Sequence, residues 1–134
     1  RQLGSHYGAL PAHAGLWEAA QATAHDPAAR LAIVPMVLEA RGLDVTPMTI
    51  ERFEAAGDNA TARILRRIFT DEIVHVAAGT RWFESCCADR QVSPQIEWRA
   101  LLERYFKGAI KPPFNDSARE TAGLTQEYYA PLAG

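Results

Sequence analysis

The chain has 134 residues, of which 48% are hydrophobic and 22% charged, and its formal net charge is −2. This length suits one domain with its own core, and this composition excludes an intrinsically disordered chain. The slight negative charge predicts no broad basic surface for nucleic acid or anionic lipid. No apolar run reaches the length of a membrane span and no signal peptide is visible, so we expect neither nucleic acid nor a membrane as a partner.

The first half of the chain contains three predicted helices. After a loop over residues 2–10, Pro11 is expected to begin a helix over residues 11–24. Asp26 followed by Pro27 is a helix-start signal, and it predicts a buried helix over residues 27–40 that Pro35 should kink. We expect Gly42 to end this helix, and a short helix to follow over residues 47–56.

The second half repeats these signals. Asp58 caps the longest predicted helix, which reaches residue 88 or 89, and Ser93 begins another that ends near residue 106. Residues 111–114 (Lys-Pro-Pro-Phe) predict a stiff extended loop, and Asn115 or Asp116 is expected to cap a short last helix. The tail after it, with Tyr128 and Tyr129, is expected to pack across the surface. No segment favours a strand, so the predicted fold class is all-α.

The two cysteines, Cys86 and Cys87, are adjacent, and neighbours in a helix point in different directions. We therefore expect no disulfide framework, which favours a reducing compartment and a cytoplasmic location. The first residue is Arg1 rather than methionine, which leaves open a missing upstream segment.

The longest predicted helix has an apolar stripe with two ionisable residues in its middle. Steps of three and four residues predict that this stripe packs against neighbouring helices. Glu72 and His75 lie three residues apart on it, so their side chains can reach one metal ion. Two interpretations remain open at equal weight: a metal site, or a buried Glu–His pair that specifies helix packing. The members of the stripe are Leu65, Ile68, Glu72, His75, Gly79, Trp82 and Cys86.

Two further carboxylates accompany this pair. Glu39 lies on the buried helix, and its neighbours at helical spacing, Pro35 and Gly42 among them, leave room beside it. It needs a partner, which is either an arginine such as Arg41 or a metal ion shared with Glu72 and His75. Asp71 is either an ordinary surface residue or a hydrogen-bond partner that orients a metal-bound imidazole.

Several strings of the chain together resemble one protein family. They are Leu-Glu-Ala-Arg-Gly-Leu-Asp at residues 38–44, Asp-Glu-Ile-Val-His at residues 71–75 and Lys-Pro-Pro-Phe-Asn at residues 111–115. An earlier string, Tyr-Gly-Ala-Leu-Pro-Ala-His at residues 7–13, looks similar as well. Together they resemble the DUF455 family, a ferritin-like group of bacterial proteins, over nearly the whole chain.

The resemblance implies a ferritin-like helical bundle with a carboxylate-bridged di-iron or di-manganese centre, and no well-established reaction. It implies that Glu39 is the single carboxylate of the third bundle helix, and that Glu72 and His75 are the bridging and terminal ligands of the fourth. Asp71 would support a ligand by a hydrogen bond. Val74 stands where the wider di-iron class often has an arginine, so one usual polar contact is absent.

A complete site of this type needs about four carboxylates and two histidines. The chain supplies only part of that set, because His6, His13, Glu18 and His25 are poor substitutes. His6 lies in a predicted loop, His25 lies beside a helix break, and His13 is expected in the core or as a support for a ligand. Residues 1–134 therefore look like the C-terminal half of a single ferritin-like domain that lacks the first two bundle helices. We expect either a homodimer or association with a missing N-terminal segment to complete the site.

The leading functional hypothesis is thus a di-metal oxidoreductase or oxygenase of unknown substrate. The alternative is a non-catalytic helical interaction module, or a metal-storage module, with a buried Glu–His pair. A hydrolase has little support, because no Gly-x-Ser-x-Gly motif is present and the cysteines have no evident base. The sequence assigns no residue a catalytic role and shows no dinucleotide-binding or phosphate-binding loop.

Overall fold

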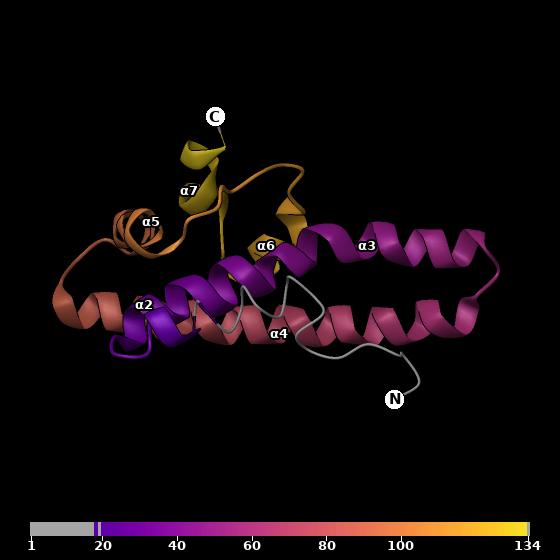
Figure 1. Ribbon diagram of the computed structural model, residues 1–134, viewed down its shortest axis with the longest axis horizontal. Helices are drawn as coiled ribbons and strands as arrows, with labels where there is room; N and C mark the ends of the chain where they lie inside the picture. The colour runs from indigo at the N-terminus through magenta and orange to yellow at the C-terminus, as the bar shows by residue number, and fades with distance from the viewer. Residues whose placement is uncertain (1–17, 19, 134) are drawn as a thin grey trace.

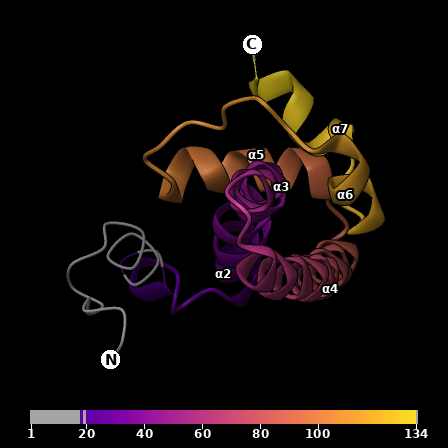
Figure 2. The same ribbon diagram turned by 90° about the vertical axis from the view of Figure 1, so that its right-hand side faces the viewer.

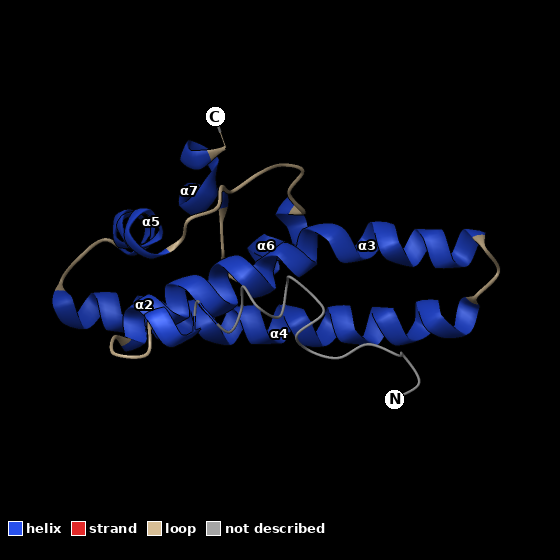
Figure 3. Cartoon of the chain, in the orientation of Figure 1, coloured by secondary structure: helices blue, strands red, loops and turns tan. Residues whose placement is uncertain are grey.

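Every regular element in the described part of the chain is helical, which confirms the predicted all-α class (Figure 3). The computed structural model describes residue 18 and residues 20–133 (Figure 1). Most of the predicted helix over residues 11–24 lies outside the described residues, and so do His6 and His13. The elements are α2 (Pro27–Ile33), the π-helix η2 (Val34–Glu39), α3 (Ala40–Ala55), α4 (Asn59–Arg90), α5 (Pro94–Tyr105), α6 (Asp116–Thr121), α7 (Gln126–Tyr129) and the 3-10 turn η3 (Ala130–Leu132).

Four of the predicted helix starts are confirmed by side-chain caps. The Asp26 carboxylate accepts hydrogen bonds from two amides of the first turn of α2. Asp58 caps α4 in the same way, Ser93 caps α5 and Asn115 caps α6. Each of these side chains satisfies amides that the helix itself leaves without partners, which is why these four starts could be recognised in the sequence.

The prediction of two separate helices over residues 27–56 is wrong. Residues 27–55 form one continuous helical stretch, so Gly42 does not end a helix and Pro47 lies inside α3. Pro47 has no amide hydrogen and cannot donate to the carbonyl of Leu43. The side-chain amide of Asn115 donates to that carbonyl instead, at 3.1 Å. A residue 72 positions away in the sequence thus supplies the hydrogen bond that would otherwise be lost.

The expected disturbance at Pro35 takes the form of the π-helix η2, and the stretch changes direction between α2 and α3 (Figure 1). Gly79 of α4 packs directly against the Pro35 ring. A Cβ atom on Gly79 would lie only 2.4 Å from Pro35 Cγ. Glycine is therefore required at this close approach.

The helical stretch α2–η2–α3 lies between two other layers. It packs along the antiparallel helix α4 on one side and, through α2, against α5 on the other, while α6 and α7 lie beside them (Figure 2). Tyr128 and Tyr129 are 0% and 1% exposed, so the C-terminal tail contributes to the core rather than only crossing the surface. The largest fully buried side chains are Trp98, Tyr128, Tyr129, Phe83, Ile33 and Met36.

A buried ion pair joins α3 to α6. Arg119 is 3% exposed, and its guanidinium donates two hydrogen bonds to Asp44, at 2.7 and 2.9 Å. The same guanidinium lies over the rings of Phe114 and Tyr129, at 5.0 and 4.6 Å from their centres. The pair therefore fixes α6 against the middle of α3.

Cys86 and Cys87 are both free thiols, as expected for adjacent residues in one helix. Among the described residues, no helix combines the length and the apolar character needed to cross a membrane.

Candidate metal centre

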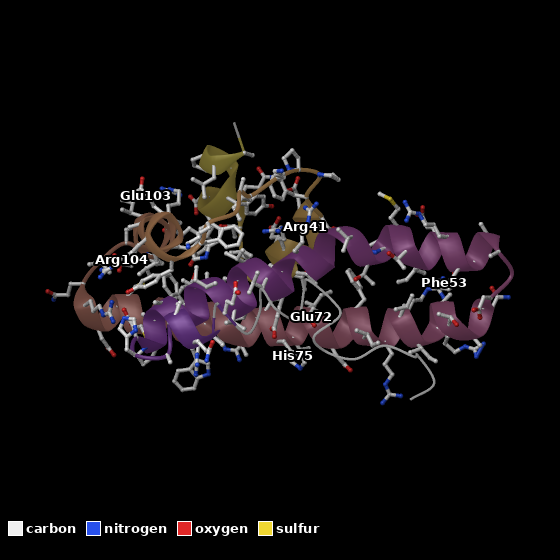
Figure 4. All side chains as sticks on the ribbon, viewed as in Figure 1. Arg41, Phe53, Glu72, His75, Glu103 and Arg104 are labelled. Atoms are coloured by element: carbon white, nitrogen blue, oxygen red, sulfur yellow. The ribbon has the colours of Figure 1, made fainter. Side chains whose placement is uncertain are left out.

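Three of the predicted site residues come together where η2 meets α4. Glu39 is the last residue of η2, and Glu72 and His75 lie one turn apart on α4 (Figure 4). The contact between Pro35 and Gly79 brings these two elements close enough for the side chains to meet. Gly42 leaves space beside the site, since a Cβ atom added to it would lie no closer than 3.9 Å to Glu72 Cγ.

The ligand atoms of Glu39, Glu72 and His75 all lie within 4.8 Å of one another. His75 Nδ1 is 3.9 Å from Glu72 Oε1. Ligand atoms bind transition metals at about 2 Å, so two ligands of one ion are at most about 4 Å apart. The three atoms are therefore within about 1 Å of the separations that one ion requires.

The Glu72 carboxylate is in an unfavourable environment. Its Oε2 atom is buried and has no hydrogen-bond partner among the described residues. Burial raises the pKa of Glu72, the nearby Glu39 carboxylate raises it further, and His75 partly opposes both. A buried carboxylate oxygen without a partner is costly, and a bound cation would remove that cost.

One side of the cluster is open. The His75 side chain is 62% exposed, whereas that of Glu72 is 23% exposed. Ile68 and Trp82, seven residues on either side of His75, are also exposed, at 51% and 66%. The cluster therefore has an exposed side next to His75.

The prediction that the whole stripe packs against neighbouring helices is accordingly wrong in part. Gly79 is buried, and Leu65, Glu72 and Cys86 are half-buried, but Ile68, His75 and Trp82 face outward. The physical reason is that α4 contacts α2, η2 and α3 along a strip rotated from the predicted one. The buried residues of that strip are Ala62, Val76, Gly79, Thr80, Phe83 and Cys87.

The remaining candidates do not join the cluster. Asp71 is exposed and makes no hydrogen bond to the three residues in the described part of the chain, so its supporting role stays a prediction. Glu18 is exposed, and His25 lies 3.2 Å from the Tyr105 hydroxyl instead. Arg41, the alternative partner of Glu39, contacts Asp44 and two backbone carbonyls.

The described structure is thus an all-helical protein with two carboxylates and an imidazole gathered at a helix contact. The DUF455 family model, described as a protein of unknown function, matches residues 1–130, and the chain belongs to this family. The chain is also similar to an uncharacterized protein of Haemophilus influenzae, with 46% identity over 130 residues. That match covers 94% of this chain and 44% of the relative, so the chain spans less than half of its relative's length. No solved structure matches the chain significantly.

Proposed function

We propose that this chain binds a divalent transition-metal ion through Glu39, Glu72 and His75. The observation that supports this proposal is the buried Glu72 Oε2 atom, which has no described hydrogen-bond partner and lies in a cluster of three ligand atoms within 4.8 Å. Carboxylates with an imidazole suit iron, manganese or zinc. On the family resemblance we propose iron or manganese, held as part of a di-metal centre in a ferritin-like bundle.

The role of these residues follows from their ionisation. Both carboxylates must be ionised and His75 must be neutral to bind the ion, so the metal affinity should rise with pH. The open side at His75 leaves room for a small molecule to approach. A di-iron or di-manganese centre supplies one-electron and oxygen chemistry when bound. We therefore propose an oxidoreductase role for this centre.

We propose that a second copy of the chain supplies the further ligands of a di-metal centre. A two-fold axis through the open side would bring together two sets of Glu39, Glu72 and His75, which gives four carboxylates and two histidines. The exposed Ile68 and Trp82 flank His75 on that side and would be buried by the pairing.

Metal content tests the proposal directly. After anaerobic loading with Fe²⁺ or Mn²⁺ and removal of free ions, the wild type should retain close to one ion per chain. Glu72→Gln keeps the size of the side chain and removes its charge, and it should reduce the retained metal about tenfold or more. Glu51→Gln, an exposed carboxylate on α3, is the matched control and should retain the wild-type amount.

Two outcomes would overturn the proposal. Wild-type protein that holds less than about a tenth of an equivalent would show that Glu72 and His75 form only a polar pair within α4. Full retention in Glu72→Gln would show that the ligands are assigned wrongly.

Sedimentation velocity tests the pairing separately: metal should shift the chain from monomer to dimer, and a metal-loaded monomer would contradict the two-fold arrangement.

A further inference from the structure

A cavity of about 460 Å³ lies between the start of α3 and the segment that joins α5 to α6. Figure 1 shows this orange segment passing over the beginning of α3. Small-molecule sites typically have volumes of about 300–1,000 Å³, so the cavity is large enough for a small organic compound.

The walls of the cavity are largely apolar. Val37 and Leu38 of η2 form one side, and Phe106, Ile110 and Phe114 form the other. Such walls favour a ligand with an aliphatic or aromatic body, because both surfaces leave water on binding.

Three cationic residues also line the cavity, and two of them are already engaged. Arg119 is paired with Asp44 in the core. Arg41 donates to the backbone carbonyls of Lys111 and Pro113, at 2.8 and 3.4 Å, and so holds the outer wall in place. Arg119 thus has a structural task in the core, whereas the printed contacts of Arg41 all come from its Nη1 atom.

Lys111 is the third cation, and it differs from the other two. It is exposed, and its ammonium group has no hydrogen-bond or ion-pair partner among the described residues. A lysine without such a partner in the wall of a largely apolar cavity complements a molecule that has an apolar body and one anionic end.

We propose that this cavity binds a small monocarboxylate whose apolar body lies between Leu38 and Phe114 and whose carboxylate pairs with Lys111. Glu39 belongs both to the wall of the cavity and to the metal-ligand cluster. The same class of molecule is therefore the substrate class of the metal centre, an assignment that rests on the function proposed above.

Calorimetric titration of the metal-free protein tests the binding. The probes are 4-phenylbutyrate and its uncharged counterpart 4-phenylbutanol. Lys111→Met should raise the Kd for 4-phenylbutyrate about tenfold or more, as expected for loss of one charged hydrogen bond, and leave the Kd for 4-phenylbutanol within about twofold. Lys107→Met is the matched control, because Lys107 is an exposed cation of the same segment outside the cavity wall, and it should change neither value.

Several results would overturn the binding proposal. One is that neither probe binds at concentrations up to about 1 mM, which is the weak end of ordinary substrate affinities. Another is an equal loss of affinity in Lys107→Met and Lys111→Met, which would show only a general charge effect. A third is an equal loss for the charged and uncharged probes.

A second measurement separates the cavity from the metal centre. With Co²⁺ bound, adding 4-phenylbutyrate should change the visible absorption of the ion, and Lys111→Met should shift this change to a higher probe concentration. An unchanged cobalt spectrum at saturating probe would overturn the assignment as substrate. Probe binding in a protein that takes up no cobalt would overturn the proposed function and support the cavity as a binding site in its own right.

Discussion

Gly79→Ala is the sharpest perturbation of the contact that positions the candidate metal ligands. A Cβ atom on Gly79 would lie 2.4 Å from Pro35 Cγ and 2.5 Å from Pro35 Cβ. Ordinary contacts begin at 3.4 Å, so α4 and η2 would have to separate locally by about 1 Å, the difference between 3.4 and 2.4 Å. The proline ring is rigid, so the helices rather than a flexible side chain must take up this shift.

We expect two effects of this separation. Overpacking of this kind costs about 1–3 kcal/mol, so the free energy of unfolding in urea should fall by that amount. Metal coordination tolerates deviations of only about 0.2 Å, so a shift of about 1 Å between Glu39 and Glu72 should also weaken Mn²⁺ binding about tenfold or more. Urea titration of the metal-free protein and calorimetric titration with Mn²⁺ measure the two effects separately.

Gly42→Ala is the matched control for this experiment. A Cβ atom on Gly42 would meet its nearest neighbours at 3.9 Å, which is an ordinary contact. Since alanine also restricts the unfolded chain, this substitution should stabilise the protein by about 0.4–1 kcal/mol. If Gly79→Ala matched Gly42→Ala in stability and in Mn²⁺ affinity, the close approach of Gly79 to Pro35 would not control the site and the reasoning would fail.

Three further predictions concern buried groups. Asp44→Ala removes the partner of the buried Arg119 guanidinium and should lower the free energy of unfolding by about 3–5 kcal/mol in urea titration; a loss below about 1 kcal/mol would contradict it. The pKa of Glu72 is raised in the folded protein, so this carboxyl group ionises more readily in the unfolded chain. Its ionisation therefore lowers the free energy of unfolding at pH values above the ordinary pKa of a glutamate. Glu72→Gln should therefore raise the Tm of the metal-free protein at pH 7 and have little effect near pH 4; an equal effect at both pH values would refute this assignment. Burial raises the pKa of the Cys87 thiol to about 11, so iodoacetamide at pH 8 should modify the half-buried Cys86 first, and equal rates measured by mass spectrometry would contradict this expectation.

Local signals in the sequence predicted several helix starts correctly. Asp26, Asp58 and Ser93 each act on amides within their own first turn, so the information lies within three residues of the cap. The same locality explains the failure at Pro47. Whether a proline ends a helix depends on the freed carbonyl, and here the partner of that carbonyl is Asn115, far along the chain. No pattern near residue 47 carries this information.

The candidate site shows the same division between local and distant information. The spacing of Glu72 and His75 placed both on one side of α4, which the structure confirms. Periodicity alone set the predicted packing face of α4 too close to Ile68 and Trp82, because the true face depends on where η2 and α3 lie. Lys111 escaped notice as a candidate ligand-binding residue, since only the fold brings residues 37–41 beside residues 106–114.

Asn115 links the stability of two helices that are distant in sequence. Its Oδ1 atom accepts from the Ala118 amide at the start of α6, while its Nδ2 atom donates to the Leu43 carbonyl in α3. A six-residue helix such as α6 does not persist alone in water. Opening α6 would also expose a carbonyl of α3 that has no helical partner, so the two helices should unfold together. Amide protons in both should therefore exchange with deuterium at similar, slow rates, and α6 belongs to the same cooperative unit as the helix that follows Glu39.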